Sequence, residues 1–200
     1  MPLTHAQENR WLIPALWALM MLATRFVEPL PVIFTGALTM AAVVAWRDRV
    51  ALRPLLRVTP RIALLAIVAT VAMIAVTYAV FPLLARSIPA IGTETRLIYS
   101  RFLSGRALLL LFAAVAPVVI AEEVLWRGAF QGALGRFAVL LAAATYAIAH
   151  APAGSLLLVI VALVCGVYWS ALRAISGSLI PPLCAHLAWD LVLIAFPLMR

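Results

Sequence analysis

Apolar residues gather into long runs along the chain, and short clusters of arginine, proline and glycine separate these runs. A helix perpendicular to the bilayer needs about 20 apolar residues to cross it. Several runs are shorter, so we expect some helices to include flanking residues, to lie shallow or to thin the bilayer. The pattern predicts an all-α bundle of about seven transmembrane helices, near residues 11–24, 30–46, 62–85, 107–126, 137–150, 156–172 and 179–199.

The composition agrees with an integral membrane protein. The 200-residue chain is 66% hydrophobic and 11% charged, with a mean hydropathy of +1.14. A soluble domain has roughly 45–50% apolar and about 25% charged residues. We predict a single membrane domain over residues 1–200, made of N-terminal spans (11–85), an interfacial connection (86–106) and a helical core with the candidate catalytic residues (107–199).

The charge predicts an orientation. The chain has 15 basic residues, all of them arginine, and 7 acidic ones, which gives a net charge of +8. Basic residues favour the cytoplasmic side of membrane proteins, so the connection from Arg47 to Arg61 and the N-terminus are predicted to be cytoplasmic. This bias accounts for the charge without nucleic-acid binding. The protein is predicted to be multi-pass in the plasma (inner) membrane, with a retained first span, since no small-x-small cleavage site precedes Arg25.

The connection at residues 86–106 mixes charged and apolar side chains. Such a mixture is typical of a helix that lies on the membrane surface, with its apolar face toward the lipid. We therefore expect an interfacial helix or a lid here.

Glu122, Glu123 and Arg127 stand at the end of an apolar run. Each charged residue at the centre of a membrane helix costs about 2.5–3.5 kcal/mol, so charges in such a place favour function or a partner inside the bundle. Glu123 and Arg127 are four residues apart and share a helix face, in the better order for an ion pair. Glu122 points about 100° away and has no local partner, which suits a general base or acid.

The other ionisable groups at membrane depth are two histidines, His150 and His186, and one carboxylate, Asp190. His186 and Asp190 lie four residues apart, so the carboxylate is placed to orient the imidazole, and Tyr146 and His150 have the same spacing. At 1.5 Å per residue, the depths of Glu122 and the two histidines spread over about 12 Å, so the groups meet only if helices tilt. Prolines precede two of them, at Pro117 and at Pro181-Pro182, and proline inside a helix bends it, which favours a wet cavity here.

Alternative readings of the cluster remain open at this point. Glu122, His150 and His186 are alternatively the ligands of a zinc ion with one open position for water, although the chain lacks HExxH. Cys165 and Cys184 have no CxxC spacing and are predicted as small buried side chains. Buried Glu and His residues are also typical of proton relays in transporters or non-catalytic membrane proteins.

These motifs, in this order, resemble the signature of the CPBP family, also called Abi or type II CAAX prenyl endopeptidase-like intramembrane proteases: Glu122-Glu123-x-x-x-Arg127, Tyr146-x-x-x-His150 and His186-x-x-x-Asp190. The resemblance covers about Ala107 to Leu193. It implies that Glu122 activates a water with the help of His150, and that His186 and Asp190 stabilise the oxyanion. Glu123 and Arg127 are implied to be structural or to assist.

Two residues depart from the family's usual motifs. Tyr146 stands where Phe is usual, and Asp190 stands where Asn is frequent. An ionised Asp190 cannot donate to an oxyanion, so it must be protonated or must orient His186 instead. The resemblance implies a membrane protein substrate that is lipidated or C-terminally sorted. The compact, arginine-only chain is more similar to the bacterial members, including the myxosortases.

Overall fold

The computed structural model describes residues 10–103, 105–135 and 137–199. Within them the protein is all-helical, with nine α-helices and short 3-10 and π segments. In chain order these elements are α2 (Leu12–Ala23), α3 (Pro29–Arg47), α4 (Arg49–Leu52), η1 (Arg53–Leu56), α5 (Pro60–Ser87), α6 (Pro89–Phe102), α7 (Leu108–Glu122), η2 (Glu123–Phe130), η3 (Gln131–Ala133), α8 (Ala138–His150), η4 (Ala151–Ala153), α9 (Leu156–Ser176) and α10 (Ile180–Ala195).

Each predicted apolar run forms a helix, but only some of these helices have the length to cross a bilayer. Among the described residues four helices are long and apolar enough: Pro29–Arg47, Pro60–Ser87, Leu108–Ala133 and Leu156–Ser176. The remaining apolar helices, at Leu12–Ala23, Ala138–Ala153 and Ile180–Ala195, are shorter than 18 residues. The chain is therefore a multi-pass helical membrane protein with four candidate spans by length, a smaller number than the seven predicted from the apolar runs.

Local capping sets several helix ends. The Thr59 side chain accepts a hydrogen bond from the backbone N–H of Ile62 at the start of α5, and Ser155 does the same for Leu158 at the start of α9. Such caps satisfy backbone donors that have no partner inside the helix. Gly177 ends α9 in the left-handed conformation, with φ +63°, where glycine avoids the strain of a side chain.

The prolines act differently from one another. Pro117 lies inside α7, as expected, five residues before Glu122. Pro181 and Pro182 lie in the first turn of α10, where a missing backbone N–H costs nothing. The bend predicted for α10 is therefore wrong, since these prolines start the helix that carries His186.

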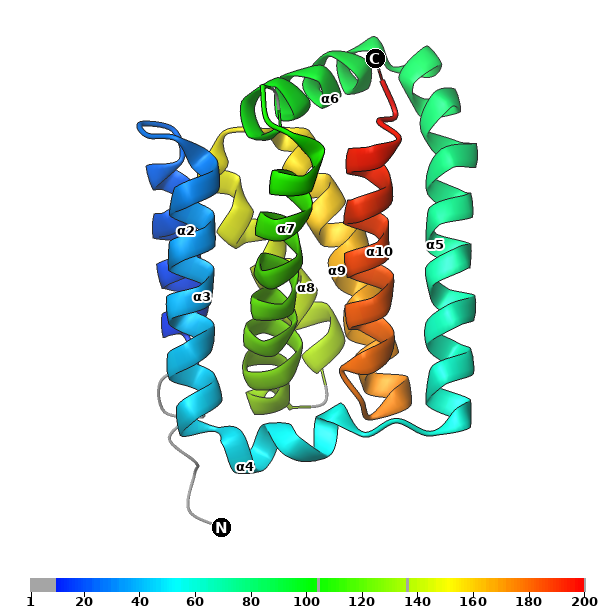
Figure 1. Cartoon of the computed structure of the whole chain (residues 1–200). Coiled ribbons are helices and arrows are strands. Elements are labelled where there is room, and N and C mark those ends of the chain that lie inside the picture. Colours follow the sequence, from blue (N-terminus) through cyan, green and yellow to red (C-terminus); the bar gives the residue numbers. More distant parts are fainter. Residues whose placement is uncertain (1–9, 104, 136, 200) are drawn as a thin grey trace.

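The helices form an upright bundle around α7 (Figure 1). Helix α7 packs against α3 and α10, α8 packs on α9 and α2, and α5 stands at one edge beside α10. Helices α8 and α9 approach closely at Gly166, where an added Cβ would lie 3.3 Å from the Ala143 backbone. Small residues allow such contacts between membrane helices. The α4–η1 segment runs beneath one end of the bundle, and α6 lies across the other (Figure 1).

Side-chain hydrogen bonds also join the helices. The Trp189 indole donates to Thr77 at 2.8 Å, which ties α10 to α5, and the Tyr168 hydroxyl donates to the Ala69 carbonyl at 2.7 Å. No water competes for such bonds inside a bilayer, which favours their use between helices. The predicted burial is confirmed for Cys165 but is wrong for Cys184, which is exposed on the outer surface of α10.

Helix α6 forms within the connection at residues 86–106, where the sequence predicted an interfacial helix or a lid, and polar contacts fix its position. Arg101 donates to the backbone carbonyls of Ala153 and Thr24 at 2.9 and 2.8 Å. The Tyr99 hydroxyl donates to the Leu193 carbonyl, and burial raises the pKa of Tyr99, so the hydroxyl keeps its proton at neutral pH. These bonds join α6 to the turns after α2 and α8 and to the end of α10.

Candidate functional site

The predicted residues come from three helices of the core. Glu122 ends α7, Glu123 and Arg127 lie on the π-helix η2 that follows directly, His150 ends α8, and His186 lies in α10. A π-helix inside an apolar helix is uncommon and is frequent at functional sites. Its wider turn changes the direction of every side chain after Glu122, relative to a regular α-helix.

Glu122 has a partner from another helix. Its Oε2 accepts a hydrogen bond from the Tyr146 hydroxyl at 2.5 Å, and both side chains are buried. Since carboxylates have several acceptor positions, this bond leaves Oε1 for a further donor such as a water. Tyr146 is the residue that departs from the usual Phe, and its phenol is what holds the carboxylate.

Glu123 lies between a cation and a histidine. Its Oε1 is 3.4 Å from Nη1 of Arg127, the predicted i,i+4 ion pair, and 2.8 Å from Nδ1 of His186. Both Glu123 and Arg127 are 1% exposed. A buried charge without a partner is strongly destabilising, so this pair holds two charges that neither residue could keep alone.

Aromatic rings surround the Arg127 guanidinium. It lies 4.6 Å from the centre of the Tyr146 ring and 5.1 Å from that of Trp169, within the range of cation–π attraction. Trp169 also stacks on His186, with ring centres 3.6 Å apart. Trp169 therefore contacts both Arg127 and His186, and its stacking fixes the plane of the imidazole ring.

His150 uses both ring nitrogens. Its Nδ1 lies 2.7 Å from the backbone carbonyl oxygen of Tyr146, and its Nε2 accepts a hydrogen bond from the Trp17 indole at 3.2 Å. Trp17 belongs to α2, far from the motif residues in the chain. The N-terminal spans thus supply a direct contact to the site.

Asp190 is farther from His186 than Glu123 is. Asp190 Oδ2 lies 3.8 Å from Nε2 of His186, too long for a hydrogen bond. The carboxylate that binds His186 is Glu123, through Nδ1. The predicted i,i+4 contact with Asp190 is present, but the orienting carboxylate comes from η2 instead.

A cavity of about 230 Å³ brings the polar residues together. Its polar lining comprises Glu122, Tyr146, His150, His186, Trp189 and Asp190. Ile98 and Phe102 of α6 line it as well, together with apolar residues of α2, α3 and α9. Glu122, His150 and His186, whose depths estimated from the sequence differ by about 12 Å, therefore line the same cavity. Helix α6 lies over this cavity.

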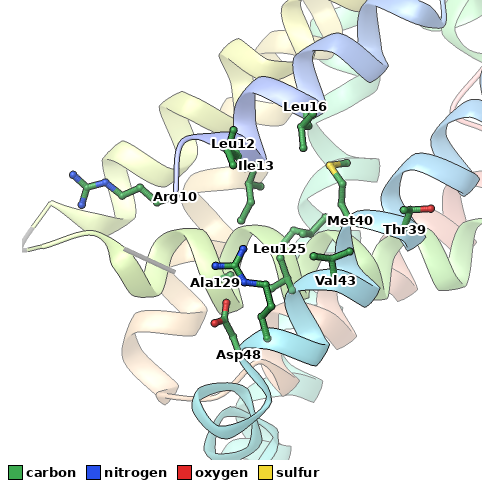
Figure 2. Close-up of a pocket in the computed structure, with 12 residues that line it drawn as sticks. Arg10, Leu12, Ile13, Leu16, Thr39, Met40, Val43, Asp48, Leu125 and Ala129 are labelled. Atoms are coloured by element: carbon green, nitrogen blue, oxygen red, sulfur yellow. The ribbon is translucent and has the colours of Figure 1, made fainter. Parts of the chain in front are cut away.

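A second cavity, of about 250 Å³, lies between α2 and α3 and holds none of the predicted residues. Figure 2 shows its apolar side chains, among them Leu16, Met40 and Val43, with Asp48 at one end. Its ionisable lining is Arg10, Arg47 and Asp48, without a histidine or any residue of the three motifs, so the candidate reaction is assigned to the Glu122 cavity.

The zinc alternative needs Glu122, His150 and His186 around one ion, and these three residues line the same cavity. Among the residues that the structure describes, no group of three or more His, Cys, Asp or Glu side chains is arranged to hold a metal ion. A histidine binds a metal through a nitrogen lone pair, and the single lone pair of neutral His150 is engaged by Trp17.

Sequence reasoning missed two aromatic residues of the site, Trp17 and Trp169, and it named Tyr146 in a motif without predicting its bond to Glu122. Tyr146 was visible as a phenol in an apolar run, and a buried Tyr hydroxyl usually has a partner. Trp17 and Trp169 lie in apolar runs with no local pattern that separates them from core or interfacial tryptophans. Only the packing of helices brings them to His150 and Arg127.

Residues 104–192 match the family described as type II CAAX prenyl endopeptidase Rce1-like. The match covers somewhat less than half of the 200-residue chain, and over this segment the chain is similar to the Rce1-like family. The match confirms the family resemblance and includes all the candidate residues of the three motifs, while Trp17 lies outside it. Rce1-like membership implies a CAAX-type intramembrane protease, by family alone. No curated protein and no solved structure matches the chain.

Proposed function

We propose that this Rce1-like protein is an intramembrane endopeptidase that hydrolyses a peptide bond of a membrane-associated protein, with Glu122 as the general base. The observation that carries the proposal is the buried Glu122 carboxylate, bonded through one oxygen to Tyr146 and lining one cavity with His150 and His186. Peptide hydrolysis needs a base on water and donors where negative charge develops, and this cavity supplies both kinds of group.

The reaction uses the free oxygen of Glu122. A water donates to Oε1, its proton passes to the carboxylate, and its oxygen forms a bond to the peptide carbonyl carbon. The carbonyl becomes an oxyanion. When that intermediate collapses, the C–N bond breaks and Glu122 returns the proton to the leaving amine, so that protons balance over the cycle.

His186 is the proposed donor to the oxyanion. Glu123 engages its Nδ1, which leaves Nε2 toward the space where Asp190 also lies. Because the Glu123 carboxylate accepts from Nδ1–H, Nε2 also carries a proton only when the ring is an imidazolium, and it then offers an N–H to the developing charge. Asp190, whose Oδ2 lies 3.8 Å from that nitrogen, stabilises a positive charge on the ring, and Glu123 orients the ring together with Arg127. His150 lines the same cavity beside the position of the water.

The cavity lining suggests how the substrate binds. Ile98 and Phe102 of α6 offer apolar surface beside the polar groups, which suits an apolar residue next to the cleaved bond. We propose about seven helices in the plasma (inner) membrane, with the Arg47–Arg61 end in the cytoplasm. The α6 end then faces away from the cytoplasm, which favours a C-terminally sorted or lipidated substrate presented on that side.

The test compares peptide termini, by mass spectrometry of membrane and secreted fractions, in cells with the wild type, with Glu122→Gln and with Glu28→Gln. Glu28 is exposed and serves as a matched control for the same chemical change. A terminus that appears with the wild type and the control but is lost with Glu122→Gln supports the proposal. Equal termini in all three strains, with Glu122→Gln normally inserted, would overturn it and favour the proton-relay reading.

A further inference from the structure

Trp17 lies outside the matched family segment and still contacts the site. Its side chain is 0% exposed, and its Nε1 lies 3.2 Å from Nε2 of His150. On the other edge of the imidazole, Nδ1 lies 2.7 Å from the Tyr146 carbonyl oxygen. The ring is therefore held at both nitrogens by groups from two different helices.

These two contacts determine the protonation of His150. An indole N–H only donates and a carbonyl oxygen only accepts. Both bonds form together only when the imidazole is neutral, with its proton on Nδ1 and its lone pair on Nε2. In the other neutral tautomer, and in the imidazolium, Nε2 carries a hydrogen that opposes the indole N–H.

Ring packing keeps Trp17 in this position. The Trp17 ring meets Trp126 edge to face, with centres 6.0 Å apart, and Trp126 meets Tyr146 in the same way at 5.0 Å. Tyr146 in turn lies 4.4 Å from the His150 ring. The four rings form a closed chain of contacts, so the indole cannot turn away without displacing the π-helix that carries Glu123.

We infer that Trp17 is a positioning residue that holds His150 in the Nδ1–H tautomer and occupies its Nε2 lone pair. The proton taken from water then passes to Glu122, and His150 acts as a neutral polar wall of the cavity. The effect of Trp17 on catalysis rests on the proposed function. The tautomer of His150 and its hydrogen bond to Trp17 do not depend on that function, so an experiment can disprove either one without the other.

The direct test is ¹⁵N NMR of the purified full chain, labelled at histidine and tryptophan, with His150→Gln to assign the His150 signals. We expect a protonated Nδ1, an accepting Nε2 and a nitrogen–nitrogen coupling across the bond to one indole. In Trp17→Phe the coupling disappears and the second tautomer becomes populated. A wild-type His150 with its proton on Nε2 overturns the inference, whether or not the variant folds.

The kinetic test uses Trp17→Phe and Trp11→Phe, the same change at the exposed residue directly before α2. We expect Trp17→Phe to lower kcat about tenfold, the usual effect of one lost hydrogen bond, with little change in KM. Trp11→Phe retains the wild-type values. A wild-type kcat in folded Trp17→Phe, or a loss confined to KM, overturns the positioning role even if Glu122→Gln is inactive.

Discussion

Glu123 Oε1 lies 2.8 Å from Nδ1 of His186, a residue 63 positions later in the chain, and 3.4 Å from the Arg127 guanidinium. The buried Glu123 carboxylate therefore connects the π-helix to α10 and balances the charge of Arg127 on its own helix. Adjacent glutamates thus have separate roles. Glu123 organises the site, and Glu122 faces the cavity with one oxygen free of Tyr146.

The Glu123–Arg127 pair is expected to dominate the stability of this region. Glu123→Gln or Arg127→Met leaves an unpaired buried charge, and each should lower the free energy of unfolding by about 3–5 kcal/mol. The double variant removes both charges and should lose less than the sum of the two. Unfolding in mild detergent measures this cycle, with exposed Glu28→Gln expected to change stability by about 0–1 kcal/mol. Strict additivity would contradict the pairing.

Tyr146→Phe removes the donor to Glu122 and keeps the ring. Hydrogen bonds to charged groups contribute about 1.5–3 kcal/mol, so we expect cleavage to persist at a rate roughly ten- to a hundredfold lower. Tyr168→Phe removes a hydroxyl bond of similar length, to Ala69 outside the cavity, and should leave the rate unchanged. Single-turnover cleavage of a fixed substrate compares the two. Equal cleavage rates for the two variants would show that the Tyr146 hydroxyl does not contribute to catalysis by Glu122.

Helix α6 is expected to influence which substrate residue the cavity accepts. Truncation of Ile98 or Phe102 to Ala removes lining next to Glu122 and should reduce kcat/KM for the preferred substrate by roughly tenfold or more. Leu97→Ala changes a neighbouring residue of α6 that is 56% exposed and should have no such effect. The informative measurement is kcat/KM over substrates that differ at one apolar position. A uniform decrease over all substrates would indicate damage to folding rather than altered selectivity.

Metal removal separates the proposed mechanism from the zinc alternative. Because His150 has its lone pair engaged by Trp17, we expect cleavage to survive prolonged chelation. Metal analysis of the same active preparation accompanies the assay. Stoichiometric zinc that is lost together with activity, and restored with it, would establish a metalloprotease and contradict the Glu122 general-base mechanism.

The sequence by itself determined the helices and the polar motifs, because both depend on short-range order. Apolar runs marked each main helix to within a few residues, since hydrophobicity is a property of neighbouring side chains. The Glu123–Arg127 pair followed from i,i+4 spacing, which survives in η2. The family resemblance came from the same short motifs. Run length predicted seven spans, whereas four helices among the described residues have the length to cross a bilayer, because a short apolar helix looks similar in sequence to a longer one.

Only the tertiary structure decided the partners of these motifs. Tyr146 for Glu122, Glu123 for His186 and Trp17 for His150 are contacts over 24, 63 and 133 residues, and they depend on how helices tilt and pack. The π-helix also changes the directions of the side chains that follow Glu122, and the spacing of residues in the sequence does not reveal this change. The physical reason is that periodicity defines the face of a helix, whereas the side chain opposite that face comes from another helix whose position depends on the whole bundle.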